Sequence, residues 1–479
     1  MRTLSVTVIA AVILLSSPLA VHAQSDKAAL DAVANALGAD RVTSIAYEGS
    51  GVIHAVGQSA TPGGPWPRFN LKSSSRSLDY DTGAMRDVIV TTQAENPPRG
   101  GGVQPARGER RQEFVLRGDH AWNMVGDAAV PAPITVADRQ FQLWATPHGI
   151  VKAALAGKGS MQGRTITVAV PERFKAEALV NDQNLIEKVV GTVPNAVLGD
   201  IRTEIVYGDY KDFGGGKFPT KIRQSSGGHP SADVVVTDVQ PNVVFDAAVP
   251  APVRQTPQPY ARVASQMVAD GVWYITGGTH HSVLIEMKDY GIVVEGPLND
   301  ERAFAVIGEA RALPPSKPIR YVVVSHHHFD HLGGIRGFAA RNVTVITHES
   351  AREFVGRALA ARATVRPDAL AKAGRTGSVE GVRSRRVLDD GTRTVEIHHI
   401  AGNGHADDLL MVYLPKEKLL VEADVFTPLA PNVAPPTPPS PYTLGFADHL
   451  RKLKLDVAQI LPLHGRIVPY GELDRTIGR

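Results

Sequence analysis

The sequence contains no cysteine, although the chain is 479 residues long. Disulfide bonds, thiolate metal ligands and a cysteine nucleophile are therefore excluded. Lipid attachment through a cysteine near the amino terminus is excluded for the same reason. The net charge of +3 is small for this length, so composition offers no case for binding nucleic acid or an anionic membrane surface.

Three catalytic signatures are also missing. No G-x-S-x-G elbow stands at a strand-to-helix turn, which disfavours a serine hydrolase. No G-x-G-x-x-G follows an expected strand and no G-x-x-x-x-G-K-[ST] occurs, so dinucleotide and nucleotide cofactors are not indicated.

Beyond the first 23 residues no apolar stretch is long enough to cross a bilayer, and we expect no permanent membrane span.

The first 23 residues have the pattern of a secretory signal peptide. Arg2 gives a basic start, residues 4–15 are almost continuously apolar, and Val21-His22-Ala23 offers a small-residue cleavage site. The apolar part is short for a membrane anchor, and Pro18 interrupts it. We therefore expect an exported protein that is periplasmic or secreted.

Residues 24–255 are expected to form an antiparallel β-rich domain. Residues 26–37 have helical periodicity, and strand-like runs then alternate with Gly-, Asp- and Asn-rich turns up to residue 249. Residues 97–111 are rich in Gly, Pro and Arg, which predicts a mobile surface loop. The proline-rich segment at 249–259 is typical of a linker, so we place the domain boundary there.

Residues 256–479 alternate between strand-like and helix-like segments, which predicts an α/β domain with helices over 302–313, 349–363 and 444–455. An apolar run in this half leads into Ser325-His326-His327-His328-Phe329-Asp330-His331, an H-x-H-x-D-H pattern. Alternate side chains of an extended backbone share a face, so His326 and His328 can face one metal ion. Asp330 and His331 follow at the turn into a helix and can face a second ion.

Three further candidate ligands end apolar runs or lie in glycine-bearing loops: His405, Asp424 and His464. The carboxyl ends of strands are where open sheets place their sites. Imidazole and carboxylate donors without thiolate suit zinc, with iron and manganese as alternatives. His327 lies between two ligands and should point away from the ion, and His348 is expected to be structural.

This ordered set resembles the metallo-β-lactamase-fold hydrolase superfamily over roughly residues 260–479. The resemblance implies an αββα sandwich, with two facing β-sheets covered by helices and metal ions in the groove at one edge. It implies a first ion held by His326, His328 and His405. It implies a second held by Asp330, His331 and His464, with Asp424 bridging the two.

The neighbours of these residues are candidates for substrate contact. His280 and His281 stand in a Gly-rich turn that overhangs the metal groove in the family, so one of them is a candidate for substrate contact, and the alternative is an exposed turn histidine without such a role. Asp407 and Asp408 follow the His405 loop and can orient a ligand histidine. The proline-rich stretch 427–441 starts just beyond Asp424, and is either a stiff wall of the substrate pocket or a plain surface connector.

The chemistry expected of this site is hydrolysis. Two divalent ions about 4 Å apart lower the pKa of bound water toward about 7 and so create a nucleophile at neutral pH. We assign Asp330 to orient that nucleophile and take its proton. The predicted cofactors are two divalent ions, zinc first, and the predicted partner is a small-molecule ester, thioester, lactone or amide. A non-heme iron oxidoreductase, a β-lactam hydrolase and a metal-stabilised ligand-binding protein stay open, and the sequence does not fix the oligomeric state.

Overall fold

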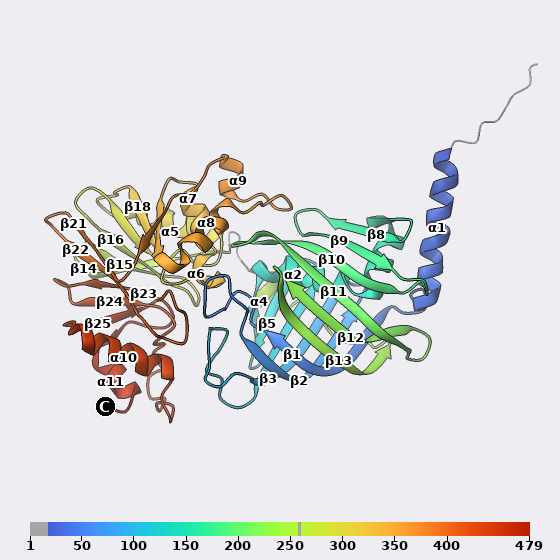
Figure 1. Cartoon of the computed structure of the whole chain (residues 1–479), viewed down its shortest axis with the longest axis horizontal. Helices are drawn as coiled ribbons and strands as arrows, with labels where there is room; N and C mark the ends of the chain where they lie inside the picture. The colour runs from blue at the N-terminus through green and yellow to red at the C-terminus, as the bar shows by residue number, and fades with distance from the viewer. Residues whose placement is uncertain (1–17, 257–259) are drawn as a thin grey trace, which may run out of the picture.

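The computed structural model describes residues 18–256 and 260–479 (Figure 1). The predicted signal peptide lies outside the described residues as far as residue 17, and its predicted cleavage point falls within helix α1 (Pro18–Leu37). Within the described ranges, no helix is both long and apolar enough to cross a membrane.

The amino-terminal half is built on one 13-stranded sheet in which every neighbouring pair is antiparallel, as the turn-punctuated strand pattern predicts. Its order is β6-β5-β4-β3-β2-β1-β13-β12-β11-β10-β9-β8-β7, so the first and last strands of this half pair at its centre. The strands are β1 (Ser44–His54), β2 (Arg68–Asp79), β3 (Ala84–Gln93), β4 (Arg110–Arg117), β5 (His120–Val125), β6 (Ala128–Pro131), β7 (Gly159–Gln162), β8 (Thr165–Val170), β9 (Phe174–Val180), β10 (Ile186–Asn195), β11 (Gly199–Asp212), β12 (Lys217–Ser226) and β13 (His229–Pro241).

Helices α1, α2 (Val136–Trp144) and α3 (Pro147–Ala153) pack against this sheet. In strand β9 the residues alternate strictly between buried and exposed, so every second side chain points toward the helices. Leu37, Phe141 and Phe174 are fully buried in the resulting core. The helices therefore cover one apolar face, whereas part of the other face is also buried, where Val115 and Trp122 pack with Val253 of the segment Ala251–Arg254.

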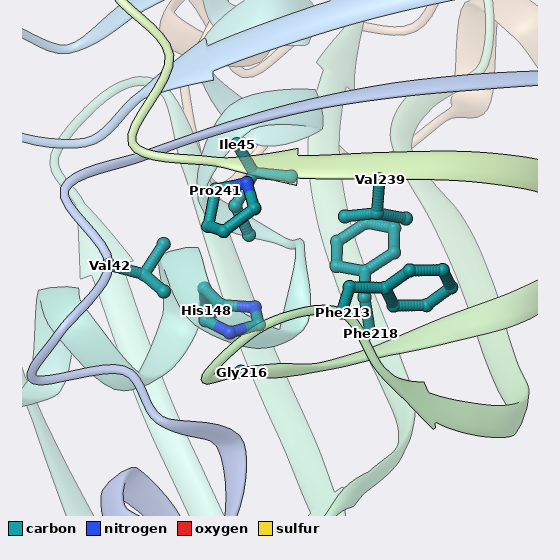
Figure 2. A pocket seen from close by; sticks show the side chains of 8 residues that line it. All are labelled: Val42, Ile45, His148, Phe213, Gly216, Phe218, Val239 and Pro241. Atoms are coloured by element: carbon teal, nitrogen blue, oxygen red, sulfur yellow. The ribbon is translucent and has the colours of Figure 1, made fainter.

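Phe218 and His148 line a small cavity in this half, between strand β12 and helix α3 (Figure 2). The cavity volume is about 10 Å³, which is room for one water molecule at most. His148 is buried there, its Nε2–H donates to the Leu37 carbonyl at 3.1 Å, and its Nδ1 has no partner among the residues that the structure describes. A cavity this small is a packing feature of the core and not a ligand site.

The carboxyl-terminal half contains two further sheets. A seven-stranded mixed sheet has the order β14-β15-β16-β17-β18-β19-β20, and a six-stranded mixed sheet has the order β21-β22-β23-β24-β25-β26. Their strands are β14 (Ala264–Ala269), β15 (Val272–Thr276), β16 (Ser282–Glu286), β17 (Gly291–Val294), β18 (Ile319–Val323), β19 (Thr344–His348), β20 (Val379–Val382), β21 (Arg385–Asp389), β22 (Thr394–His399), β23 (Leu410–Leu414), β24 (Leu419–Glu422), β25 (Gln459–Pro462) and β26 (Val468–Pro469).

These two sheets face each other across a core that includes Ile285 and Val323 from one and Val412 and Leu461 from the other. Helices cover both outer faces, which confirms the predicted αββα arrangement. The helices are α5 (Asp300–Ala312), α6 (Phe329–Leu332), α7 (Ile335–Ala339), α8 (Arg352–Ala360) and α9 (Ala369–Ala373) beside the first sheet, and α10 (Pro441–Leu453) and α11 (Gly471–Thr476) beside the second. Short helix α4 (Ala251–Arg254) lies in the predicted linker region, where the exact domain boundary stays a prediction.

The two halves meet along a seam made by loops of the large sheet. Gly100 N–H donates to the Gly404 carbonyl at 2.9 Å, and the Tyr442 hydroxyl donates to the Gly100 carbonyl at 2.9 Å. The prediction of a mobile surface loop is therefore wrong for the first part of 97–111. The glycines that suggested mobility let its backbone lie directly against the other half.

Candidate metal centre

His326 and His328 follow strand β18 at its carboxyl end, and both side chains are completely buried. The backbone reaches helix α6 at Phe329, so Asp330 and His331 fall in the first turn of a helix, as the sequence predicts. His405 lies in the loop between β22 and β23, Asp424 follows β24, and His464 follows β25. The structure thus gathers strand ends from both facing sheets at one edge of the sandwich.

A first donor group consists of His326, His328, His405 and Asp424. Nε2 of His326 lies 2.8 Å from Nδ1 of His328 and 3.2 Å from Nε2 of His405. Nε2 of His405 lies 3.0 Å from Oδ2 of Asp424. Three imidazole nitrogens and one carboxylate oxygen therefore converge on one small volume.

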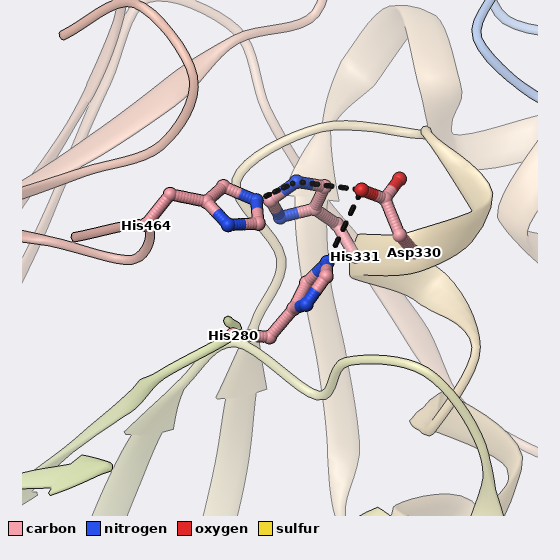
Figure 3. Close-up of side chains that lie close together, drawn as sticks. All are labelled: His280, Asp330, His331 and His464. Carbon is pink, nitrogen blue, oxygen red and sulfur yellow. Dashed lines mark hydrogen bonds and ion pairs between the residues drawn. The ribbon is translucent and has the colours of Figure 1, made fainter. Parts of the chain in front are cut away.

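A second donor group consists of His280, Asp330, His331 and His464 (Figure 3). Nε2 of His331 lies 3.2 Å from Nε2 of His464, and Nε2 of His280 lies 3.2 Å from Oδ2 of Asp330. The rings of His280 and His464 meet edge to face at a centroid distance of 4.3 Å. His280 enters from the turn between β15 and β16, so this turn contributes a donor atom and does more than overhang the groove.

Asp424 lies between the two groups. Its Oδ2 is 3.0 Å from His405 Nε2 and 3.3 Å from His331 Nε2, and its Oδ1 is 3.1 Å from His464 Nε2. The residue has a φ of 65°, in the left-handed region that non-glycine residues seldom adopt. Such strain persists only where the surrounding structure demands it, and here it aims one carboxylate at both groups.

Several of the ring nitrogens that point away from the two groups have partners, whereas the buried Nδ1 of His405 has none among the described residues. Nδ1–H of His331 donates to Glu295 Oε2 at 2.9 Å, and Nδ1–H of His464 donates to the Thr279 carbonyl at 2.7 Å. These hydrogen bonds direct Nε2 of each ring toward the site, where the neutral ring can present a lone pair to a metal ion. Ser325 Oγ lies 2.9 Å from His326 Nδ1 and supports the first group in the same way.

The loop between β1 and β2 of the amino-terminal half also reaches this centre. Nε2–H of His328 donates to the Ser59 carbonyl at 2.8 Å, which leaves Nδ1 free to face the first group. Nε2 of Gln58 donates to Oδ1 of Asp330 at 2.8 Å. Both contacts connect residues roughly 270 positions apart in the chain, and each touches a different donor group.

Burial and mutual charge set the protonation of the bare donor set. Burial, with the neighbouring His331 and His405, lowers the pKa of His326 to about 3. Burial alone would raise the pKa of Asp424, but His331 and His464 hold it well below its usual range. His331 goes the other way, because the surrounding carboxylates raise its pKa well above the usual range in spite of burial. A buried anion between imidazoles is the electrostatic pattern expected of a cation site.

The donor set fits divalent metal ions. Tetrahedral coordination with metal–nitrogen bonds of about 2.0–2.1 Å spaces the donor atoms by about 3.3 Å. The donor atoms within each group lie within 4.8 Å of one another, and their closest pairs are 2.8–3.2 Å apart. Each group could thus hold one ion, with Asp424 within reach of both.

The remaining predicted residues belong to neither donor group. His281 is buried behind the turn with its ring 5.1 Å from that of Tyr274, and burial lowers its pKa to about 4. Asp408 holds His327 and not a ligand histidine, which corrects one of the two orienting roles that the sequence suggested. His348 donates to the Arg383 carbonyl at 2.7 Å, in keeping with a structural role.

Sequence reasoning missed Glu295, Gln58 and Ser59. Glu295 had a usable signal, because it is a lone acid directly after the buried strand β17 and is itself fully buried. Gln58 and Ser59 had none, since both residue types are ordinary in a turn.

Comparison with protein families agrees with this geometry. Residues 275–471 match the family model described as the metallo-beta-lactamase superfamily. The carboxyl-terminal half of the chain belongs to this superfamily. A metallo-beta-lactamase from Pontibacter korlensis is similar in structure at 16% identity, covering 45% of this chain and 97% of that one, with a TM-score of 0.36. A metallo-beta-lactamase from Pseudomonas aeruginosa in its mono-zinc form is 17% identical, covering 45% and 93%, with a TM-score of 0.33.

One curated relative shares part of the sequence. The 2,4-dinitroanisole O-demethylase subunit alpha of a Nocardioides species is 28% identical over 174 residues, which is 36% of this chain and 49% of the relative. The chain thus spans about half the length of this relative.

Proposed function

We propose that this protein is an exported, binuclear metal-dependent hydrolase that cleaves an ester, thioester, lactone or amide. The observation that carries the proposal is the position of Asp424 between two convergent donor groups. Two divalent ions held there would supply Lewis-acid polarisation of a substrate carbonyl and a nucleophilic water at neutral pH. The all-nitrogen-and-oxygen donor set favours zinc, with iron and manganese as alternatives.

The chain's own residues would act on the nucleophile. Asp330 presents Oδ2 toward His280 and His331, so this oxygen lies at the centre while Oδ1 is held by Gln58. A carboxylate in this place can orient a water molecule and take the proton released when water adds to the carbonyl carbon. The proton can then pass to the leaving group as the carbon–oxygen, carbon–sulfur or carbon–nitrogen bond breaks.

The metal count tests the binuclear part of the proposal. Wild-type protein should contain about two ions per chain by elemental analysis. His326→Ala should lose mainly the first ion and His331→Ala mainly the second. A single ion in wild type that persists unchanged in His331→Ala would overturn the binuclear centre.

A substrate panel tests the hydrolase part. Nitrophenyl esters, a thioester, a lactone and a β-lactam cover the proposed bond types. The curated relative is named for O-demethylation of 2,4-dinitroanisole, so this aryl methyl ether belongs in the panel as well. Turnover that disappears after chelation and returns with zinc supports the proposal. Wild-type hydrolytic activity in His331→Ala would contradict the proposal.

A second candidate is an iron-dependent oxidoreductase on the same fold. One observation favours it: His280 brings the protein donors around the second position to four, and Asp424 adds a fifth. Catalytic zinc usually keeps three protein ligands and an open position. Iron in protein purified without added metal, together with oxygen consumption, would favour this candidate over the zinc hydrolase.

Export is the remaining part of the proposal. It is supported by the basic, apolar and small-residue pattern of the first 23 residues. Protein recovered from the periplasm of a bacterial host should begin near residue 24 by amino-terminal sequencing. A chain that starts at Met1 in the membrane fraction would show that the segment is an anchor.

A further inference from the structure

Two consecutive residues of the amino-terminal half touch both donor groups of the candidate metal centre. The Ser59 carbonyl accepts from His328 Nε2, and the Gln58 amide donates to Asp330 Oδ1, each at 2.8 Å. His328 belongs to the first group and Asp330 to the second. The large sheet therefore supplies hydrogen bonds to the metal centre that the metallo-beta-lactamase half does not make for itself at these atoms.

The orientation of the Gln58 amide is fixed by a third residue. Gly102 N–H donates to Gln58 Oε1 at 2.8 Å, and a backbone N–H can only donate. The oxygen of the amide must face Gly102, so its NH₂ group must face Asp330. The contact with Asp330 is thus a hydrogen bond to a carboxylate, which is stronger than one between neutral groups.

This hydrogen bond distinguishes the two oxygens of Asp330. Oδ1 is held by Gln58, whereas Oδ2 lies 3.2 Å from His280 Nε2 and 3.6 Å from His331 Nε2. Only Oδ2 faces the second donor group. A carboxylate with one oxygen occupied in this way offers a metal ion one donor atom in a defined direction.

The loop that carries Gln58 is itself held in place. The Gly57 carbonyl accepts from Phe329 N–H at 3.2 Å, and the Ala60 carbonyl accepts from Asp407 N–H at 2.8 Å. Gly57 has a φ of 78°, and a Cβ there would lie 2.3 Å from the Phe329 ring. The close approach requires glycine, and it brings Gln58 to a defined distance from Asp330.

On the basis of the binuclear centre proposed above, we propose that Gln58 is a positioning residue for the second metal ion. It acts through Asp330, by holding Oδ1 so that Oδ2 is the single oxygen offered to the ion. The amino-terminal β-sheet is accordingly part of the metal centre and not an independent appendage. Without the amide, the carboxylate can rotate and present either oxygen. The second ion should then bind more weakly and with a different coordination geometry.

The experiment uses the full chain with three substitutions. Gln58→Met keeps the length of the side chain and removes the hydrogen bond, and Gln58→Ala removes both. Thr61→Val is the matched control, because Thr61 donates to Asp407 Oδ2 at 2.7 Å across the same seam without touching a ligand. Each protein is stripped with a chelator and titrated with Co²⁺, and visible absorption and calorimetry follow the two binding steps.

The wild-type protein and Thr61→Val should bind two ions with the same affinities and the same spectra. Both Gln58 variants should bind the first ion normally and the second about 10- to 100-fold more weakly, the usual cost of losing such an outer hydrogen bond. The absorption spectrum of the second Co²⁺ should also change. If Gln58→Met binds the second ion with wild-type affinity and Gln58→Ala does not, the side chain of Gln58 contributes only packing. That result would overturn the inference.

Two other results are decisive. Unchanged second-ion affinity and spectrum in both Gln58 variants, with two ions in wild type, would overturn the role of Gln58 and leave the binuclear proposal standing. A single Co²⁺ in wild type would overturn the binuclear proposal, and the role of Gln58 with it.

Discussion

Nδ1 of His327 lies 2.6 Å from Oδ1 of Asp408, and both side chains are sealed from solvent, at 1% and 0% exposure. His327 stands between two donor histidines in the chain but points away from them, toward the other side of the loop. Its Nε2 lies 3.0 Å from Ser59 Oγ. The pair therefore holds the loop that carries the metal donors from behind, against both the six-stranded sheet and the amino-terminal half.

Asp408→Ala should reduce stability sharply. Removing the carboxylate leaves the buried His327 ring N–H without its hydrogen-bond acceptor, and an unsatisfied buried donor costs about 1–3 kcal/mol. The free energy of unfolding from urea titration measures this. Asp407→Ala is the control, because Asp407 is 45% exposed at its side chain and its ion pair with Arg99 is a surface one. The control should change stability by about 1 kcal/mol or less, and equal effects in the two variants would contradict the prediction.

His280 and His281 should behave differently although they are adjacent. Nε2 of His280 faces Asp330, whereas His281 packs against Tyr274 behind the turn. His280→Gln should therefore lower the affinity for the second ion, roughly tenfold or more. His281→Gln should leave both affinities unchanged and act mainly on thermal stability. Competitive titration with a zinc chelator measures the affinities, and an unaltered second ion in His280→Gln would exclude that residue as a donor.

The histidine and aspartate donors were predictable because their signal is local. Strand alternation places His326 and His328 on one face, and strand ends in a layered α/β fold meet at one edge. His405, Asp424 and His464 stand at such strand ends, but it was their ordered resemblance to the metallo-β-lactamase superfamily that separated them from other acids and histidines of the half. The αββα layering follows from the same alternation of apolar strands and helices.

Gln58 and the 97–107 loop could not be predicted because their role depends on the docking of one half onto the other. Glutamine and glycine have no chemistry that marks them as partners of a metal ligand. The glycine- and proline-rich composition that normally indicates a mobile loop is here what lets Gly101 lie against His328, where a Cβ would be 2.8 Å from its ring. Contacts between distant segments are set by tertiary packing, which local pattern does not encode.

Arg107 should control access to the groove. Its guanidinium donates to the Thr437 carbonyl at 3.1 Å and also to the Pro438 carbonyl, so the 97–107 loop is tied to the proline-rich stretch beyond Asp424. If residues 427–441 form a wall of the substrate pocket, this contact holds the wall in place, and if they are a plain connector its loss should not affect substrate binding. Arg107→Met should raise KM for a good substrate by about tenfold, the equivalent of one hydrogen bond to a charged group of about 1.5 kcal/mol, with metal content unchanged.

Lys72→Met is the control for Arg107→Met. Lys72 pairs with Glu109 near the end of the same loop, and its side chain is 53% exposed. The control should leave KM unchanged. Equal KM values in wild type, Arg107→Met and Lys72→Met would show that the stretch is only a connector.

The stability of the amino-terminal half should fall as the pH is lowered, and His148 is one named cause. Burial lowers the pKa of His148 to about 4 in the folded state, against about 6.5 for an unfolded histidine. Above pH 6.5 the ring is neutral in both the folded and the unfolded state, so its protonation does not change the free energy of unfolding. Between about pH 6.5 and pH 4 the unfolded chain binds a proton that the folded chain does not, so stability is lost as the pH falls, on the order of 3 kcal/mol in full.

His148→Gln removes this titration and keeps an amide donor for the Leu37 carbonyl. The difference in the free energy of unfolding between pH 7.5 and pH 4.5 should therefore be smaller in the variant than in wild type, whatever the variant's stability at either pH. Urea titrations followed by tryptophan fluorescence measure it, since Trp66, Trp122 and Trp144 lie in this half. His120→Gln, at an exposed position on β5, should keep the wild-type pH dependence. An undiminished dependence in His148→Gln would mean that the buried imidazole is not a source of acid lability.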